Sequence, residues 1–113
     1  MEYTLSISQK AIAENFPLLD IKDAAIIDFI GRFAHSKKIQ KKVEGQTIYY
    51  WIDYKKVASE NPLLKLNSEA IRKRIRTLCV FGIFQAHPLN RGGRVFFSFG
   101  DNYEKTHKYA GEQ

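Results

Sequence analysis

Residues 67–86 read NSEAIRKRIRTLCVFGIFQA, a stretch in which a helix start, a helical apolar stripe and a helix stop follow one another. Asn67 or Ser68 can cap the first turn, and Gly82 suits the left-handed residue that ends a helix. At about 100° per residue, one side of this helix carries Ile71, Ile75, Leu78 and Cys79. The other side carries Glu69, Arg72, Lys73 and Arg76, with Arg74 on the flank. The pattern predicts a helix from residue 68 to about residue 80, buried on one side and cationic on the other.

Helix signals of the same kind occur three more times upstream. Each has a polar N-cap followed by apolar residues at helical spacing. They predict a helix from residue 21 to about residue 34 capped by Asp20, a short helix after Ser8, and a second short helix after Asp53 that stops at Asn61-Pro62.

Strand signals fall between these helices and after the last of them. The β-branched and aromatic residues of Thr47–Ile52 (TIYYWI) predict one strand. Ile83–Ala86 and Arg94–Phe99 predict a hairpin, because they flank the turn sequence Asn90-Arg91-Gly92-Gly93. Alternating apolar residues at positions 3, 5 and 7 predict a further short strand, and the polar segment Ser36–Gln46 predicts a loop.

The predicted order is helix, strand, short helix, turn, helix, hairpin. This order is that of a winged helix-turn-helix, an α+β and mostly helical fold whose C-terminal β-hairpin is the wing. We therefore divide the chain into an N-terminal strand and short helix (residues 1–20), a winged helix-turn-helix domain (21–100) and a polar tail (101–113).

Positive charge is concentrated in the middle of the chain. The 113 residues include 18 Lys and Arg against 12 Asp and Glu, a net charge of +6. Residues 37–100 carry thirteen basic and four acidic side chains, whereas residues 1–36 and 101–113 are both net negative. A localised excess of this kind is typical of proteins that bind a polyanion, although charge can also serve solubility alone.

Several function classes are disfavoured by the composition. No apolar run approaches the ~20 residues of a membrane span, and no secretory signal is recognised, so we expect a cytoplasmic protein. The single cysteine excludes an internal disulfide. The three histidines lack metal-ligand spacing and no phosphate-binding glycine loop occurs, so we expect no enzyme activity, no metal site and no cofactor.

The cationic side of the helix at 68–80 is the candidate nucleic-acid site. A helix fits the major groove, and arginine can donate two hydrogen bonds to guanine. The predicted reading residues are Glu69, Arg72, Lys73 and Arg76; the predicted wing contacts are Arg91 and Arg94; the predicted backbone contacts are Lys55, Lys56 and Ser68. A solvated helix face is the alternative. The lysine run at 37–42 is either a solvated loop or a further phosphate contact.

The chain resembles the N-terminal winged-helix domain of phage and plasmid replication proteins, including replisome organisers, over about residues 7–99. The matching segments are ISQKAIAENF (7–16), the helix at 19–30, EGQTIYYWIDYKKVASENPLL (44–64), NSEAIRKRIRTLCVFGIFQA (67–86), RVFFSFG (94–100) and Asn102-Tyr103. The chain departs from that family at LCVFGI (78–83), where the family has LE..GL, and this makes the surface around Val80 and Phe81 more apolar. The resemblance implies binding of double-stranded DNA at an origin or operator.

We therefore expect a sequence-specific double-stranded-DNA-binding protein, acting in replication initiation or transcription control of a phage, plasmid or bacterial mobile element. The alternative is a protein-interaction module in which Tyr3–Phe16 or Val80–Phe81 packs on a partner. A single module buries little DNA surface, so a homodimer is also expected, and its interface would be the apolar N-terminal segment.

Overall fold

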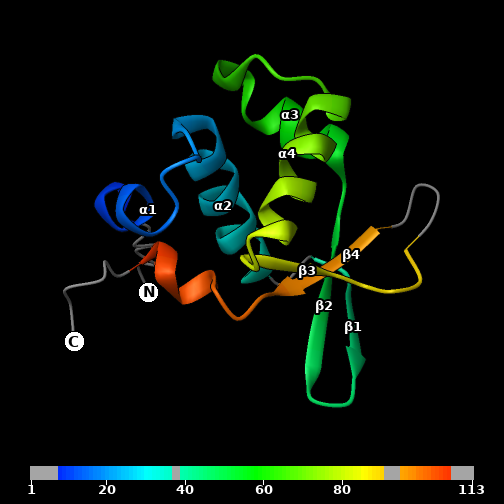
Figure 1. Ribbon diagram of the computed structural model, residues 1–113. Coiled ribbons are helices and arrows are strands. Elements are labelled where there is room, and N and C mark those ends of the chain that lie inside the picture. The colour runs from blue at the N-terminus through cyan, green and yellow to red at the C-terminus, as the bar shows by residue number, and fades with distance from the viewer. Residues whose placement is uncertain (1–7, 37–38, 91–94, 108–113) are drawn as a thin grey trace.

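The computed structural model describes residues 8–36, 39–90 and 95–107, and Figure 1 shows their arrangement. The elements in chain order are α1 (Gln9–Asn15), α2 (Ile21–Ala34), β1 (Lys41–Glu44), β2 (Thr47–Ile52), α3 (Tyr54–Glu60), the 3-10 turn η1 (Pro62–Leu64), α4 (Ser68–Val80), β3 (Phe84–Ala86), β4 (Val95–Phe99) and the 3-10 turn η2 (Tyr103–Thr106). The chain is thus an α+β domain with four helices and a four-stranded antiparallel sheet.

All four predicted helices with N-caps are confirmed, and each begins directly after its capping residue. Side-chain oxygens of Ser8, Asp20, Asp53 and Asn67 accept hydrogen bonds from backbone N–H groups of the first turn. Asp20 and Asp23 cap α2 reciprocally, since each side chain accepts from the other's backbone N–H. After α4, Gly82 has a φ of +78°, the left-handed conformation predicted at that position.

The sheet has the strand order β1-β2-β4-β3. β3 and β4 pair antiparallel with Phe84 opposite Phe99, which confirms the predicted hairpin. β4 also pairs with β2, with Tyr50 opposite Phe97, so the last strand lies between β2 and β3. Residues 91–94 of the hairpin turn and the strand predicted at residues 3–7 lie outside the described residues.

The prediction of a loop over Ser36–Gln46 is wrong for its second half. Lys41–Glu44 forms β1 and pairs antiparallel with β2 through a turn at Gly45, whose φ is +63°. β1 lies at the edge of the sheet, and all four of its side chains are exposed. An edge strand of charged residues has no apolar alternation, so its sequence resembles that of a polar loop.

One core joins the helices to the sheet. Its fully buried members include Ile26, Ile52, Ile71, Ile75, Leu78 and Ile83. Ile12 and Phe16 of α1 belong to the same core, so the described part of the N-terminal segment packs within the domain. The apolar residues that suggested an N-terminal dimer interface are therefore buried in the monomer between residues 11 and 16.

Part of the predicted polar tail also packs against the domain. Thr106 in η2 is fully buried, and its carbonyl oxygen accepts a hydrogen bond from the backbone N–H of Ser8 at 2.9 Å. The side-chain amide of Asn15 donates to the carbonyl of Lys105 at 2.9 Å. Figure 1 shows α1 and η2 side by side, so the two ends of the described chain stabilise each other. No helix in the described ranges is long and apolar enough to cross a membrane.

Candidate nucleic-acid interface

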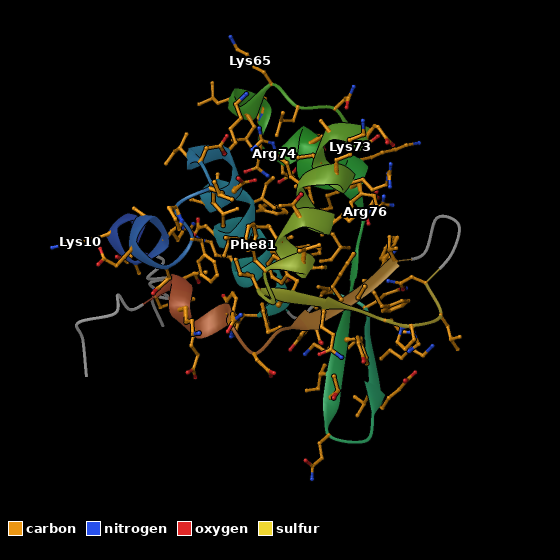
Figure 2. The ribbon with its side chains drawn as sticks, in the orientation of Figure 1. Lys10, Lys65, Lys73, Arg74, Arg76 and Phe81 are labelled. Atoms are coloured by element: carbon orange, nitrogen blue, oxygen red, sulfur yellow. The ribbon has the colours of Figure 1, made fainter. Side chains whose placement is uncertain are left out.

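Helix α4 has the rotation that its sequence predicts. Ile71, Ile75 and Leu78 are all at most 1% exposed. On the opposite side, Lys73 and Arg76 are exposed, and Figure 2 shows both side chains pointing outward from the helix. The predicted cationic side is therefore accessible over about one turn of α4, at Lys73 and Arg76.

Glu69 and Arg72 form a pair on this outward side. The Arg72 guanidinium donates from Nε to Glu69 Oε1 at 3.0 Å and from Nη2 to Oε2. These hydrogen bonds lower the pKa of the Glu69 carboxyl below its ordinary value. Within the described residues, neither Lys73 nor Arg76 has a salt bridge. Lys73 and Arg76 are thus the uncompensated charges of the helix face, while Glu69 holds Arg72 in a fixed orientation.

Arg74 has a different role from the other basic residues of α4. Its Nη1 donates to Asp20 Oδ1 at 2.8 Å and to Asp23 Oδ1 at 3.0 Å, across 54 and 51 residues of sequence. The two carboxylates cap α2, so Arg74 joins α4 to the start of α2. It points away from the face that carries Lys73 and Arg76, as Figure 2 shows.

We expect Arg74→Ala to destabilise the fold by about 1–3 kcal/mol at pH 7, because it leaves the buried Asp23 carboxylate without its cation. Burial is the main cause that raises the pKa of Asp23, and the hydrogen bonds from the Asp20 backbone and Arg74 oppose it. Loss of Arg74 raises that pKa further. Arg74 stabilises only the ionised carboxylate, so the difference from wild type should shrink as the pH falls through the pKa of Asp23. Urea unfolding at several pH values measures this.

Arg32→Ala is the matched control for that variant. It removes the Arg32–Asp28 pair, in which Arg32 is 62% exposed, and ion pairs at the surface contribute little stability. An equal loss in the two variants would contradict a specific role for the Arg74 contacts.

A cleft of about 300 Å³ separates α4 from the β3–β4 hairpin. Its walls are formed by Tyr54, Arg72, Arg76, Cys79, Ala86, Asn90, Val95 and Phe97. Burial raises the pKa of the Tyr54 hydroxyl and raises that of the Cys79 thiol to about 11. Both groups are therefore neutral at physiological pH, and Cys79 is not an activated nucleophile. The cleft places the two arginines next to the hairpin.

The structure brings Lys55 and Ser68 together and separates them from Lys56. Lys55 and Ser68 line one pocket of about 320 Å³ beside the first turn of α4. Lys56 turns toward α2, where its Nζ lies 5.2 Å from the centre of the Phe33 ring. The predicted wing residues Arg91 and Arg94 lie outside the described residues. Lys37 and Lys38 of the lysine run also lie outside them, whereas Lys41 and Lys42 belong to β1.

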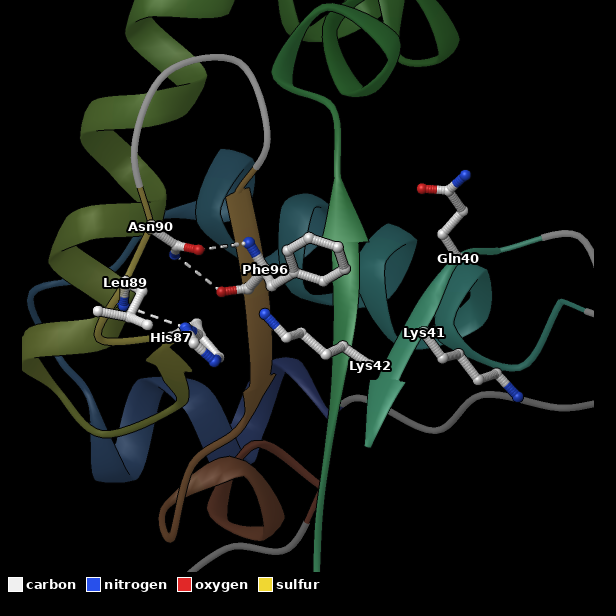
Figure 3. Close-up of a pocket in the computed structure, with 7 residues that line it drawn as sticks. All are labelled: Gln40, Lys41, Lys42, His87, Leu89, Asn90 and Phe96. Atoms are coloured by element: carbon white, nitrogen blue, oxygen red, sulfur yellow. Dashed lines mark hydrogen bonds between the residues drawn. The ribbon is translucent and has the colours of Figure 1, made fainter. Parts of the chain in front are cut away.

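Two residues that the sequence did not single out as functional fix the chain at the base of the β3–β4 turn. His87 is 5% exposed; its Nδ1 accepts from the backbone N–H of Leu89 at 3.0 Å, and its Nε2 lies 2.8 Å from Glu44 Oε2. Nε2 therefore carries the proton and donates to the carboxylate. Asn90 bonds both the N–H and the carbonyl of Phe96, at 2.8 and 2.9 Å, as Figure 3 shows. These contacts hold both chain segments that flank residues 91–94.

The apolar C-terminal end of α4 packs only in part against the rest of the domain. The Phe81 ring packs edge-on against Phe16, with ring centres 6.0 Å apart. Val80 is 81% exposed and stands alone at the end of the outward side. No group of His, Cys, Asp and Glu that could hold a metal ion occurs in the described ranges.

Comparisons with protein-family models, with curated proteins and with solved structures found no match for this chain. The resemblance to phage and plasmid replication proteins therefore depends on the sequence motifs alone.

Proposed function

We propose that this chain is a sequence-specific double-stranded-DNA-binding protein of the winged-helix type, which acts in the cytoplasm in replication initiation or transcription control of a phage, plasmid or bacterial mobile element. The observation that carries the proposal is the outward side of α4, where Lys73 and Arg76 are exposed and have no salt-bridge partner among the described residues. A helix face that serves solubility alone would also be cationic. Here, however, the cationic face lies next to the cleft and the β3–β4 hairpin, as expected of a DNA-binding face.

The strand order supports the winged-helix assignment. Apart from the additional strand β1 and the turn η1, elements α2, β2, α3, α4, β3 and β4 occur in the order of that fold, and β4 lies between β2 and β3. The shared core packs α3 and α4 against α2 and the sheet. In this arrangement α4 is the recognition helix and the β3–β4 turn is the wing.

In the proposed major-groove complex, the predicted basic residues would contact DNA bases or phosphates. The groove is about 12 Å wide and accepts α4, with Arg76 directed at a guanine edge and Lys73 at a phosphate. Arg72, oriented by Glu69, reaches a second base. Lys55 and Ser68 lie beside the first turn of α4, where a phosphate would pass. Lys56, whose Nζ lies over the Phe33 ring, and the wing residues Arg91 and Arg94 would be further contacts to the DNA backbone.

The alternative function, a protein-interaction module, has less support. Phe16 and Phe81, two of the apolar residues that suggested it, pack against each other in this chain. Val80 is the exposed apolar residue that remains at the end of α4. One isolated exposed valine is ordinary for a protein surface.

We expect the protein to bind random duplex DNA with a log affinity that falls linearly with log salt, by roughly 0.9 for each phosphate neutralised. Fluorescence anisotropy over a salt series measures this slope. Arg91→Ala should weaken all sequences alike and make the slope shallower by about one, as loss of one phosphate contact does. A protein that fails to bind duplex at low salt would contradict the proposal. If the protein binds, selection from a random duplex pool gives its preferred site.

A further inference from the structure

We propose that β1 is a self-association strand: the β1 strands of two copies pair antiparallel across a two-fold axis at Val43 and extend the sheet through both chains. β1 lies at the edge of the sheet, and no described segment pairs with its outer side. The β1–β2 hairpin also projects from the body of the domain, as Figure 1 shows. An edge strand offers unpaired backbone groups that a second strand can bind.

The backbone geometry of the hairpin determines which residues of β1 present their backbone groups to a second strand. Residues 45 and 46 form a two-residue turn, which makes Glu44 and Thr47 the hydrogen-bonded pair that closes it. Gln40 lies four residues before Glu44, so it faces the same way along the strand. Its carbonyl oxygen also accepts a hydrogen bond from β2, from the Trp51 N–H at 3.0 Å. Because hydrogen-bonding direction alternates along a strand, the N–H and C=O of Val43 point outward, away from β2.

Charge decides between the symmetric registers. A two-fold axis that pairs identical strands places one residue opposite its own copy. If that residue were Lys41, Lys42 or Glu44, two like charges would face each other, which is unfavourable in a cross-strand pair. With Val43 at the axis, two valines face each other instead. Lys42 of each copy then lies opposite Glu44 of the other copy, so the sequence Lys42-Val43-Glu44 is complementary to itself.

The side chains of β1 suit this register on both faces of the sheet. Val43 is 67% exposed and stands opposite Ile48, which is 42% exposed, so two copies would bring four exposed apolar side chains together. On the other face, Oε2 of Glu44 accepts a hydrogen bond from His87 and forms a salt bridge with Lys42. The second carboxylate oxygen, Oε1, has no partner among the described residues. Oε1 is therefore available to Lys42 of the second copy.

The interface involves only four residues of each strand, so the dimer should be weak in free solution. Interfaces well below about 1,200 Å² are typical of transient complexes, and we expect a dissociation constant of about 0.1–1 mM. Sedimentation equilibrium should show a mass that rises from 13.1 kDa toward twice that value with concentration. A constant mass of 13.1 kDa up to about 1 mM would overturn the proposal.

Two sets of variants test the register. Val43→Lys should abolish the rise in mass, whereas Leu63→Lys, at another exposed apolar residue, should leave it unchanged. Lys42→Glu and Glu44→Lys should each associate less than wild type, because like charges then face each other. An equimolar mixture of these two variants should associate again, because opposite charges then meet between chains.

The mixture separates pairing between chains from the Lys42–Glu44 contact within one chain, which neither variant retains. A mixture that behaves like its components, or association that survives Val43→Lys, would overturn the proposal. Sedimentation is measured without DNA, and all of these variants keep Lys73 and Arg76, so a failure of self-association would leave the proposed DNA face of α4 standing.

Discussion

Replacing Lys73 and Arg76 together by alanine is expected to weaken duplex binding by roughly thirtyfold or more, because each contact to a base or phosphate contributes about 1–3 kcal/mol. These two side chains carry the uncompensated charge of α4 and are exposed. Fluorescence anisotropy on the selected duplex and on random duplex would measure the loss. The salt slope should also become shallower, by about one for each phosphate contact removed.

The same experiment distinguishes contacts to bases from contacts to phosphates. Arg76→Ala alone should lose more affinity on the preferred sequence than on random duplex, because a base contact carries sequence information. Lys65→Ala, an exposed lysine on the turn between η1 and α4, serves as the control and should change little. Melting temperatures should stay at the wild-type value, since neither Lys73 nor Arg76 belongs to the core. Unchanged duplex affinity after removal of Arg72, Lys73 and Arg76 would exclude α4 as the DNA site and favour the protein-interaction function.

The second large effect concerns stability. Ile75→Ala is expected to lower the free energy of unfolding by roughly 2–5 kcal/mol, the usual loss when a fully buried aliphatic side chain is truncated. Ile75 is 1% exposed and lies between the other buried residues of α4, so its truncation would open an apolar cavity in the core. A small domain has only about 5–15 kcal/mol of stability in all, so the change should be plain in chemical denaturation.

A graded series makes this prediction specific. Ile75→Val removes one methylene and should cost only about 0.5–1.5 kcal/mol. Val80→Ala, on the exposed end of the same helix, should cost about 0.5 kcal/mol or less. If Ile75→Ala and Val80→Ala destabilised equally, the orientation of α4 would be wrong, and the assignment of its DNA face would fail with it.

The helices were predictable because their signals are local. Asp20 and Asn67 cap the residues that directly follow them, and the stripe Ile71, Ile75, Leu78 repeats within two helical turns. Such signals act over three or four residues, so they are readable in one sequence. The rotation of α4, and therefore the side on which Lys73 and Arg76 lie, follows from that stripe alone.

The tertiary structure decided the features whose partners lie far apart in the chain. β1 is a strand because β2 supplies its hydrogen bonds, and its own residues are as polar as those of a loop. Likewise, the bond from His87 to Glu44 spans 43 residues, and the contact of Arg74 with Asp20 spans 54. No local sequence pattern around either residue of such a pair identifies its partner. Periodicity and caps act within a turn, so the helical segments and the buried side of α4 can be predicted from local sequence. Only the folded chain decided which polar groups meet and where the sheet ends, because long-range pairing depends on packing that no local pattern encodes.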